Sequence, residues 1–360
     1  MKSSYSKEDV TFLLRDVSHI KMEKDTEERE RLIQRGTHYA EMLPVEFHPN
    51  EQYMKLFYET LHAYAARIAT AVGVVAEKII ANKPLGDIVL VSLARAGTPV
   101  GILIKRYYSY KYKVDIPHYS VSIIRDRGID ETALLYISKQ HPQGHIQFID
   151  GWTGKGAITK ELVKSCETFN RKYNRQLDAT LAVLADPGHC AGIYGTRDDF
   201  LIPSACLNST VSGLVSRTIL NPKFLEEGDF HGAKFYDELI DADVSNEYIE
   251  KIVSHYASTQ QDVYAALNIT SNEAPTWKGL ESVEKIKKDF GITNSNYIKP
   301  GVGETTRVLL RRVPWKILVN PQFNQDLQHI YLLAEERGVP IETYKDMSYS
   351  CCGLIKEMGK

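Results

Sequence analysis

The chain has 360 residues, which is enough for two or three domains. Hydrophobic residues make up 43% and charged residues 25%, which are ordinary values for a globular protein. The formal net charge of -2 excludes a strong overall attraction to nucleic acid or to a membrane surface.

No apolar run approaches the ~20 residues of a membrane helix, and the N-terminus lacks the apolar core of a signal peptide. The five cysteines form neither a CxxC pair nor an even disulfide framework. This usage is typical of a reducing compartment. We therefore expect a cytoplasmic protein without a membrane partner.

The N-terminal part is polar at first and then helical. Charges of both signs are dense over 21–35, which is typical of a solvated helix or loop. Apolar residues at helical spacing, among them Leu56, Leu61 and Ile68, predict a long helix over 50–81. We expect residues 1–84 to form an N-terminal helical cap.

Strand and helix patterns alternate through the middle of the chain, which indicates a mainly parallel sheet. Buried-strand patterns predict strands near 88–93, 118–124, 145–150 and 179–185. We therefore expect an α/β domain over residues 85–270. Ligands of such sheets bind at the carboxyl ends of the strands.

A small-residue turn, Ala94-Arg95-Ala96-Gly97, follows the first of these strands. Small side chains let the backbone approach an anion, and the guanidinium of Arg95 offers several donors to phosphate oxygens. The simpler interpretation is a strand that ends in a glycine turn.

A glycine-rich loop follows the strand at 145–150. Its residues are Gly151, Trp152, Thr153, Gly154, Lys155 and Gly156, and a helix pattern begins at Ala157. Converging backbone N–H groups and the helix N-terminus favour a phosphate, and Asp150 could bind hydroxyl groups. The loop therefore suits a phosphorylated sugar.

These two loops resemble those of type I phosphoribosyltransferases, in which a strand leads into acids and then Thr-Gly-x-Thr. The resemblance implies a phosphoribosyltransferase-like fold that uses phosphoribosyl pyrophosphate with Mg²⁺. Asp150 would orient the ribose, residues 153–157 would hold its 5′-phosphate, and Arg95 with its loop would bind pyrophosphate. The family usually has two adjacent acids, whereas this chain has one.

The same resemblance identifies further candidate substrate-binding residues. Arg125 and Arg127 lie where the family has a mobile loop and could neutralise pyrophosphate, although an exposed salt-bridged turn explains them equally well. Asp186 and Phe200 are candidates for holding a nucleobase-like acceptor. The reaction would proceed by positioning and electrostatic stabilisation, without a covalent intermediate.

The C-terminal part begins after a linker pattern at 270–276, and we expect a small α/β domain over residues 275–360. The pattern predicts a helix beginning near 301, a strand at 315–319, a helix at 325–338 and a strand at 339–344. The unit resembles the Pelota-type RNA-binding domain. The matching residues are Gly301, Glu304, Thr306, Arg307 and Gly338-Val339-Pro340.

A basic cluster lies in the same unit and could contact RNA phosphates. It consists of Arg307, Arg311, Arg312 and Lys316. The resemblance also makes Glu304 a candidate RNA-binding residue. The alternative is a docking module with a solvated helix.

The order of the two units resembles a bacterial family associated with tellurium resistance and stress, whose members are also labelled StiP-like cysteine proteases. The preferred hypothesis is a phosphoribosyltransferase that makes a nucleotide-like or nucleoside-like metabolite. A cysteine hydrolase using Cys190 beside His189 is one alternative. A non-catalytic regulator that binds a nucleotide and RNA is another, and a second copy of the chain is a further candidate partner.

Overall fold

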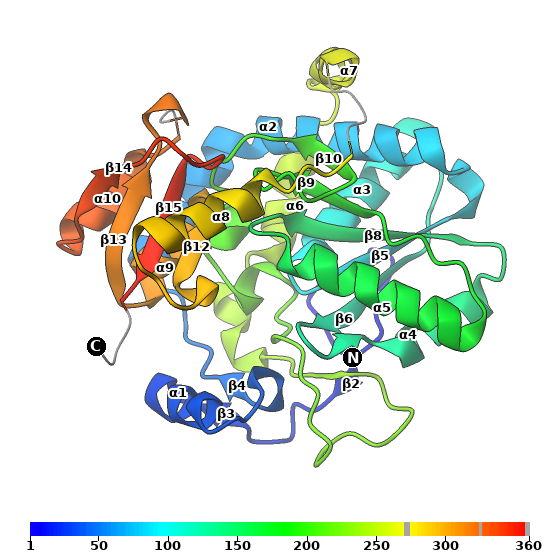
Figure 1. Cartoon of the computed structure of the whole chain (residues 1–360). Coiled ribbons are helices and arrows are strands. Elements are labelled where there is room, and N and C mark those ends of the chain that lie inside the picture. Colours follow the sequence, from blue (N-terminus) through cyan, green and yellow to red (C-terminus); the bar gives the residue numbers. More distant parts are fainter. Residues whose placement is uncertain (270–273, 324–325, 357–360) are drawn as a thin grey trace.

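The computed structural model describes residues 1–269, 274–323 and 326–356. A large α/β body lies beside a smaller C-terminal unit, drawn in orange to red in Figure 1. Most of the linker predicted at 270–276 lies outside the described residues. The domain boundaries expected near 84, 270 and 275 stay predictions.

Buried apolar runs form the strands of the main sheet. These strands are β1 (Thr11–Phe12), β5 (Ile88–Ala94), β6 (His118–Ile124), β7 (Gly128–Ile129), β8 (His145–Trp152), β9 (Leu181–Ala185) and β10 (Ile193–Thr196). Their order is β1-β6-β5-β8-β9-β10, with every pair parallel, while β7 pairs antiparallel with β6. The mixed α/β class with a mainly parallel sheet and the four predicted strands are thereby confirmed.

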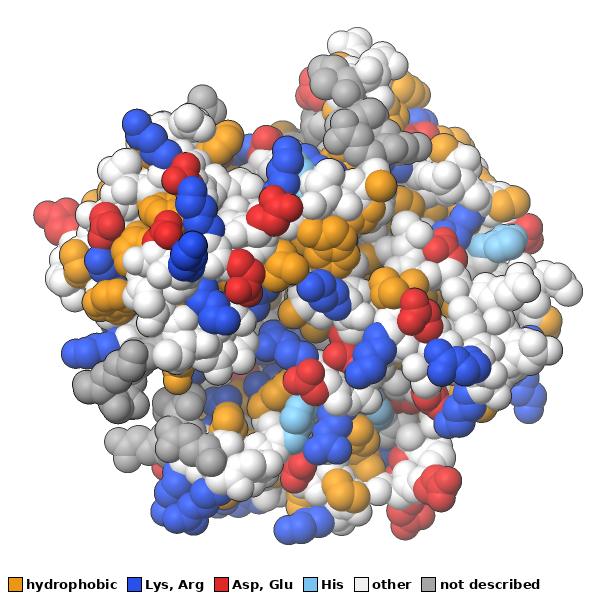
Figure 2. Space-filling view, in the orientation of Figure 1, with side chains coloured by type: hydrophobic (Ala, Val, Ile, Leu, Met, Phe, Trp, Pro, Cys, Tyr) orange, Lys and Arg blue, Asp and Glu red, His pale blue; other side chains and the backbone are white. Residues whose placement is uncertain are grey.

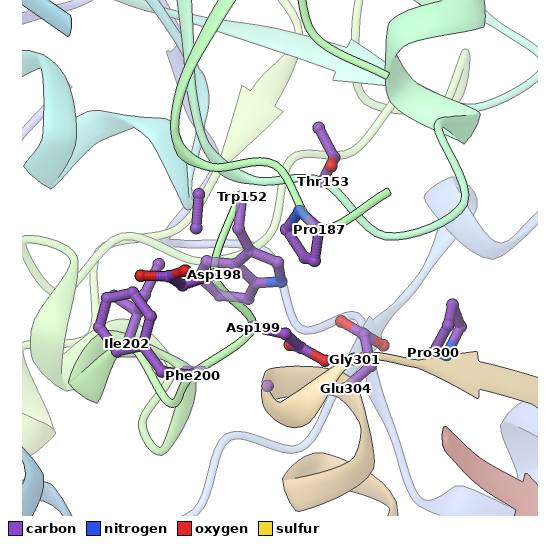
Figure 3. Close-up of a pocket in the computed structure, with 13 residues that line it drawn as sticks. Trp152, Thr153, Pro187, Asp198, Asp199, Phe200, Ile202, Pro300, Gly301 and Glu304 are labelled. Atoms are coloured by element: carbon purple, nitrogen blue, oxygen red, sulfur yellow. The ribbon is translucent and has the colours of Figure 1, made fainter. Parts of the chain in front are cut away.

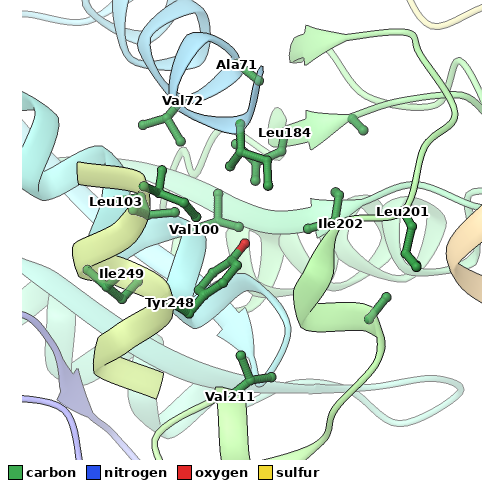
Figure 4. Close-up of a cluster of buried hydrophobic side chains, with 14 of the residues drawn as sticks. Ala71, Val72, Val100, Leu103, Leu184, Leu201, Ile202, Val211, Tyr248 and Ile249 are labelled. Carbon is green, nitrogen blue, oxygen red and sulfur yellow. The ribbon is translucent and has the colours of Figure 1, made fainter. Parts of the chain in front are cut away.

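Helices cover both faces of this sheet, so its strands are apolar on both sides. In β8, Phe148 packs toward one face and Ile149 toward the other, and both are fully buried. The first face carries α4 (Glu131–Gln140) and α5 (Ala157–Tyr173). The second carries α2 (Glu51–Asn82), α3 (Gly97–Tyr112) and α6 (Ser245–Val253), whose side chains converge in Figure 4.

The long helix predicted over 50–81 is confirmed as α2. The segment before it forms the short elements β2 (Arg15–Asp16), β3 (Glu23–Lys24), α1 (Thr26–Gln34) and β4 (Leu43–Pro44). A later strand, β11 (Gly232–Ala233), pairs with β2, and α7 (Gln260–Ile269) ends the larger body. Short 3₁₀ turns lie at Tyr39–Glu41, Leu85–Asp87, Pro203–Ala205, Ser209–Val211, Asp237–Ala242, Ser295–Tyr297 and Pro321–Phe323.

The C-terminal unit is a four-stranded sheet with helices. Its elements are α8 (Lys278–Asp289), β12 (Ile298–Pro300), α9 (Val302–Arg311), β13 (Pro314–Val319), α10 (Gln328–Glu336), β14 (Ile341–Thr343) and β15 (Cys351–Ile355). The strand order is β12-β15-β13-β14, and only the β13–β14 pair is parallel. The helix expected after Gly301 and the two strands expected in this unit are confirmed.

The fold brings the two loops of interest together. β5 lies between β6 and β8, so the direction in which strands are added reverses at β5. Such a switch point leaves a crevice at the carboxyl ends of the strands. The turn after β5 and the glycine loop after β8 meet there, and the C-terminal unit docks against the same edge through Asp199. The carboxylate of Asp199 accepts the backbone N–H groups of Val302 and Ser350, both at 2.8 Å.

Candidate functional site

The glycine loop joins β8 to α5 and packs closely on its neighbours. Gly156 has a φ of 79° and is the N-cap of α5. A Cβ atom at this position would lie 2.5 Å from Cζ3 of Trp277 and 2.8 Å from Sγ of Cys190. The hydroxyl of Thr153 donates to the carboxylate of Asp186. Only glycine fits at 156, because a side chain would meet both steric clash and a left-handed backbone.

A cavity of about 250 Å³ lies in front of this loop. Its lining includes most of the residues that the sequence predicted at the strand ends, namely Ala96, Arg125, Asp150, Trp152, Thr153, Gly154, Lys155, Gly156 and Ala157. The C-terminal unit contributes Lys299, Glu304 and Arg307 to the opposite wall. On this face of the molecule, Lys and Arg side chains gather around a hollow between α1 and the C-terminal unit (Figure 2).

Asp150 is half-buried at the end of β8. One of its carboxylate oxygens accepts the backbone N–H of Gly151 at 2.8 Å. Burial raises the pKa of Asp150 to about 7, although this N–H and the charge of Arg307 act in the opposite direction. The carboxyl group is therefore close to half-protonated at neutral pH, and Asp150 could act as an acid, a base or a hydroxyl ligand.

Arg95 and Arg127 do not line this cavity. The guanidinium of Arg95 donates to the carbonyl of Val215 at 3.2 Å and lies 3.7 Å from the carboxylate of Glu46. Arg127 is exposed and lies 3.4 Å from Glu41. The loop around Arg95 is compact: Ala94 ends β5, and Gly97 begins α3.

Gly97 has a packing role. A Cβ atom there would lie 2.4 Å from the carbonyl oxygen of Ile149 in β8. The glycine therefore lets α3 begin close against the strand that carries Asp150.

Asp186 shapes the loop after β9. Its buried carboxylate accepts the backbone N–H groups of Cys190 at 2.8 Å and Ala191 at 3.1 Å, and pairs with Arg197 at 2.6 Å. Burial raises its pKa, and these partners oppose the rise. The carboxylate satisfies groups of its own loop, so it has little capacity left for a ligand.

Phe200 lies in a packed contact between the two units. The guanidinium of Arg67 lies 4.0 Å above the centre of its ring. The small cavity beside it holds only about 10 Å³, close to the space for one water molecule. In Figure 3 the indole of Trp152 occupies the middle of this contact, with Asp199 on the side of the C-terminal unit, to which Glu304 of α9 belongs.

The residues predicted to bind RNA separate into two groups. Glu304 and Arg307 face the cavity, where they pair at 3.2 Å, and the Arg307 guanidinium lies 5.2 Å from the centre of the Trp152 ring. Arg312 is exposed, and Lys316 pairs with Glu342 at 2.7 Å. The side chain of Arg311 lies outside the described residues.

Sequence reasoning missed Lys299, Trp277 and Tyr349 at this site. Lys299 lines the cavity, Trp277 packs on Gly156, and the hydroxyl of Tyr349 donates to the carbonyl of Gly154 at 3.0 Å. None of them stands in a recognisable local motif. Their roles arise because the C-terminal unit folds back on the glycine loop.

All five cysteines are buried and none forms a disulfide. The thiol of Cys190 lies behind the glycine loop, where it donates to the carbonyl of Gly188 at 3.1 Å and lies 3.9 Å from the carbonyl oxygen of Gly154. Burial and the neighbouring charge of Asp186 raise its pKa to about 12, while Arg197 and Lys160 act to lower it. In this arrangement the thiol is protonated at neutral pH.

The described part of the chain contains neither a membrane-spanning helix nor a cluster of metal-binding side chains. None of its helices combines the length and the apolar character needed to cross a membrane. Within residues 1–269, 274–323 and 326–356, no three His, Cys, Asp or Glu side chains gather where they could hold a metal ion.

Comparison with known proteins identifies relatives of both units. A family model described as "Tellurite-like stress resistance cysteine protease StiP" matches residues 3–253. A model described as "PELOTA RNA binding domain" matches residues 277–357. The "Cysteine protease StiP" of Acinetobacter baylyi is 36% identical over 371 residues, which cover 99% of this chain and 94% of that protein.

These matches overturn the phosphoribosyltransferase assignment, both as function and as enzyme class. The relatives are named as a cysteine protease, which agrees with the alternative hypothesis. Phosphoribosyl pyrophosphate and a nucleobase therefore lose their support as partners. The resemblance misled because a glycine loop between a strand and a helix serves close backbone packing in many α/β proteins. Here Gly156 packs against Trp277 and Cys190.

Proposed function

The chain belongs to the StiP family, and we propose that it is a thiol-dependent peptide hydrolase with Cys190 as its nucleophile. The observation that carries this choice is the position of the Cys190 sulfur against the back of the glycine loop. The front of the same loop lines the cavity. A displacement of this loop would therefore expose the thiol to a substrate in the crevice.

The other four thiols lie in hydrophobic cores. Cys166 packs between the main sheet and α4 and α5, and Cys206 and Cys351 belong to the cluster around α2 and α3. Cys352 lies in the core of the C-terminal unit. Cys190 is also buried, but its neighbours are backbone carbonyls and charged groups at the edge of the sheet. Nearby cations such as Arg197 and Lys160 favour a thiolate, whereas burial keeps this thiol protonated in the present arrangement.

The reaction would follow ordinary thiol chemistry. The Cys190 thiol gives up its proton and the thiolate attacks the peptide carbonyl carbon. The C–N bond then breaks to leave a thioester, and the amine departs carrying the proton that the thiol released. Water then hydrolyses the thioester and restores the thiol. Since burial raises the pKa of Cys190 to about 12, the loop has to move before the thiolate forms, and Arg197 and Lys160 then favour it.

Buried serine–histidine pairs do not offer an alternative nucleophile. Ser92 lies 2.8 Å from His118, and Ser122 lies 2.8 Å from His231. Both serines are fully buried, and neither lines the cavity. These pairs satisfy hydrogen bonds within the core.

Matched cysteine variants test the proposal. We expect Cys190→Ala to lose cleavage of an unfolded protein such as casein by at least about a thousandfold, because the nucleophile is gone. Cys166→Ala, the control, removes a buried thiol that lines neither of the two cavities described above, and its cleavage rate should stay within about twofold after correction for stability. Undiminished cleavage by a folded Cys190→Ala variant would contradict the proposal.

We also propose that the C-terminal unit binds RNA through Arg312 and Lys316. The match to a Pelota RNA-binding model supports this, and neither side chain lines the cavity that holds Arg307. Phosphate contacts by these side chains should make binding weaken with salt. In a filter-binding assay at low salt, Lys316→Ala should lower RNA affinity more than Lys251→Ala on the larger body.

The expected Mg²⁺ stays a prediction. Asp150 and Glu304 are acids of the cavity wall, but Arg125, Lys155, Lys299 and Arg307 stand beside them. A divalent cation without a bound anion does not fit among these residues, because the surrounding positive charges repel it.

A further inference from the structure

The first residues of the C-terminal unit lie directly on the loop that carries Cys190. The backbone N–H of Trp277 donates to the carbonyl of His189 at 2.9 Å. The backbone N–H of Gly279 donates to the carbonyl of Gly188 at 3.0 Å. The segment 277–279, which leads into α8, is therefore attached by its backbone to the two residues that precede the proposed nucleophile.

The side chain of Trp277 adds a second contact, on the glycine loop after β8. A Cβ atom on Gly156 would lie 2.5 Å from Cζ3 of this indole and 2.8 Å from the sulfur of Cys190. The indole and the thiol thus pack against the same glycine. From the side of α5, the ammonium group of Lys160 lies 5.3 Å from the centre of the indole ring.

Three glycines from three separate segments meet around the thiol. A Cβ atom on Gly279 would lie 2.7 Å from Cα of Gly188, and a Cβ atom on Gly188 would overlap the carbonyl oxygen of Gly154. Tyr349 closes the group, because its hydroxyl donates to that same carbonyl at 3.0 Å. Backbones approach this closely only where no side chain separates them. The contact is therefore specific to the docked position of the C-terminal unit.

No space for a substrate remains beside the sulfur of Cys190. Its side chain is fully buried, with the carbonyl oxygens of Gly188 and Gly154 at 3.1 Å and 3.9 Å. A nucleophile has to come within about 3–3.5 Å of the carbon that it attacks. The glycine loop fills this shell, and moving the loop would break the bond from Tyr349 and the contact with Trp277. A substrate and the docked C-terminal unit therefore exclude each other.

We propose that the segment 277–279 makes the C-terminal unit an intramolecular inhibitor of the hydrolase, which becomes active when this segment leaves the Cys190 loop. The inference rests on the proposed function of Cys190. Release of the segment has two effects: it opens a path to the sulfur, and it removes the burial that keeps the thiol protonated.

Labelling of the full chain with iodoacetamide tests the cover over the thiol. In Trp277→Ala we expect Cys190 to react about 10- to 100-fold faster than in the wild type, because the labelling rate follows the fraction of open molecules. Trp315→Ala is the control and should stay within about twofold, since this partly exposed tryptophan packs on Phe290 inside the C-terminal unit. The buried thiol of Cys166 reports unfolding of the larger body. Equal acceleration in the control, or equal acceleration at Cys166, would overturn the proposal.

A second variant acts through the backbone contact. Gly279→Ala places a methyl group 2.7 Å from Cα of Gly188, so we expect the segment to separate more often and Cys190 to label about 3- to 30-fold faster. Gly86→Ala is the matched control, because no atom lies within 4 Å of its Cβ position. Unchanged labelling in both Gly279→Ala and Trp277→Ala would show that the segment does not cover the thiol.

Cleavage of casein separates this proposal from the hydrolase itself. Trp277→Ala and Gly279→Ala should cleave faster than the wild type, by factors similar to those for labelling. If the wild type cleaves casein and neither variant cleaves it faster, the inhibition is wrong and the hydrolase stands. If labelling accelerates but no form cleaves casein, the hydrolase and its inhibition both fail, and the segment only covers an unreactive thiol.

Discussion

Tyr349 of the C-terminal unit donates a hydrogen bond to the carbonyl oxygen of Gly154 at 3.0 Å. The same carbonyl oxygen lies 3.9 Å from the sulfur of Cys190. The C-terminal unit thus holds the segment of chain that covers the proposed nucleophile. Docking of this unit and access to the thiol are therefore coupled through one backbone carbonyl.

Removing the Tyr349 hydroxyl should loosen this cover. In Tyr349→Phe, we expect iodoacetamide to label Cys190 about threefold to tenfold faster than in the wild type, because a hydrogen bond contributes about 1 kcal/mol. Labelling is followed by mass spectrometry of the peptide that contains Cys190. Tyr344→Phe is the control, since its hydroxyl bonds Asp289 within the C-terminal unit. Equal rates in the two variants would contradict the coupling.

The two glycines of the loop should differ in their tolerance of a methyl group. Gly156→Ala places a Cβ 2.5 Å from Trp277 on a backbone with a φ of 79°, and we expect a loss of about 2–4 kcal/mol in the free energy of unfolding. Gly154→Ala meets no atom within 4 Å and should change stability by less than about 1 kcal/mol. Urea unfolding measures both, and a neutral Gly156→Ala would show that the loop is not tightly packed.

Asp150 should make stability depend on pH. Its pKa rises from 3.8 to about 7 on folding, so the folded protein binds this proton more tightly than the unfolded chain. Its contribution to stability therefore falls as pH rises from about 4 to about 7. Asp150→Asn should stabilise the protein by roughly 1–3 kcal/mol at pH 8 and by less at pH 5. Urea unfolding at both pH values checks this, and an equal gain at both would refute it.

Asp199 should hold the two units together. Its carboxylate accepts two backbone N–H groups of the C-terminal unit, so Asp199→Ala leaves both donors unpaired and should cost about 2–4 kcal/mol. Asp198→Ala next to it removes an ion pair with Arg67 that is partly exposed, which should cost less than about 1 kcal/mol. Thermal unfolding measures the stability of both variants. Limited proteolysis should release the C-terminal unit faster only from Asp199→Ala.

Local sequence patterns led to the wrong hypothesis about function, the phosphoribosyltransferase. The Arg-Ala-Gly turn and the glycine loop do meet at one edge of the sheet, as expected. Arg95, however, turns toward Glu46 and Val215, and the thiol that sequence reasoning ranked low lies directly behind Gly156. A short motif specifies a backbone shape, and that shape is compatible with more than one chemistry.

The sequence by itself determined the strands β5, β6, β8 and β9, the helix α2 and the place of the glycine loop, because hydrophobic periodicity and glycine act over a few residues. Tertiary structure alone decided that Lys299, Glu304 and Arg307 face Lys155 across a cavity, and that Cys190 is sealed. These relationships join residues more than a hundred positions apart or depend on how two units dock. They follow from the packing of whole surfaces against each other, which the hydrophobic periodicity of a short segment does not predict.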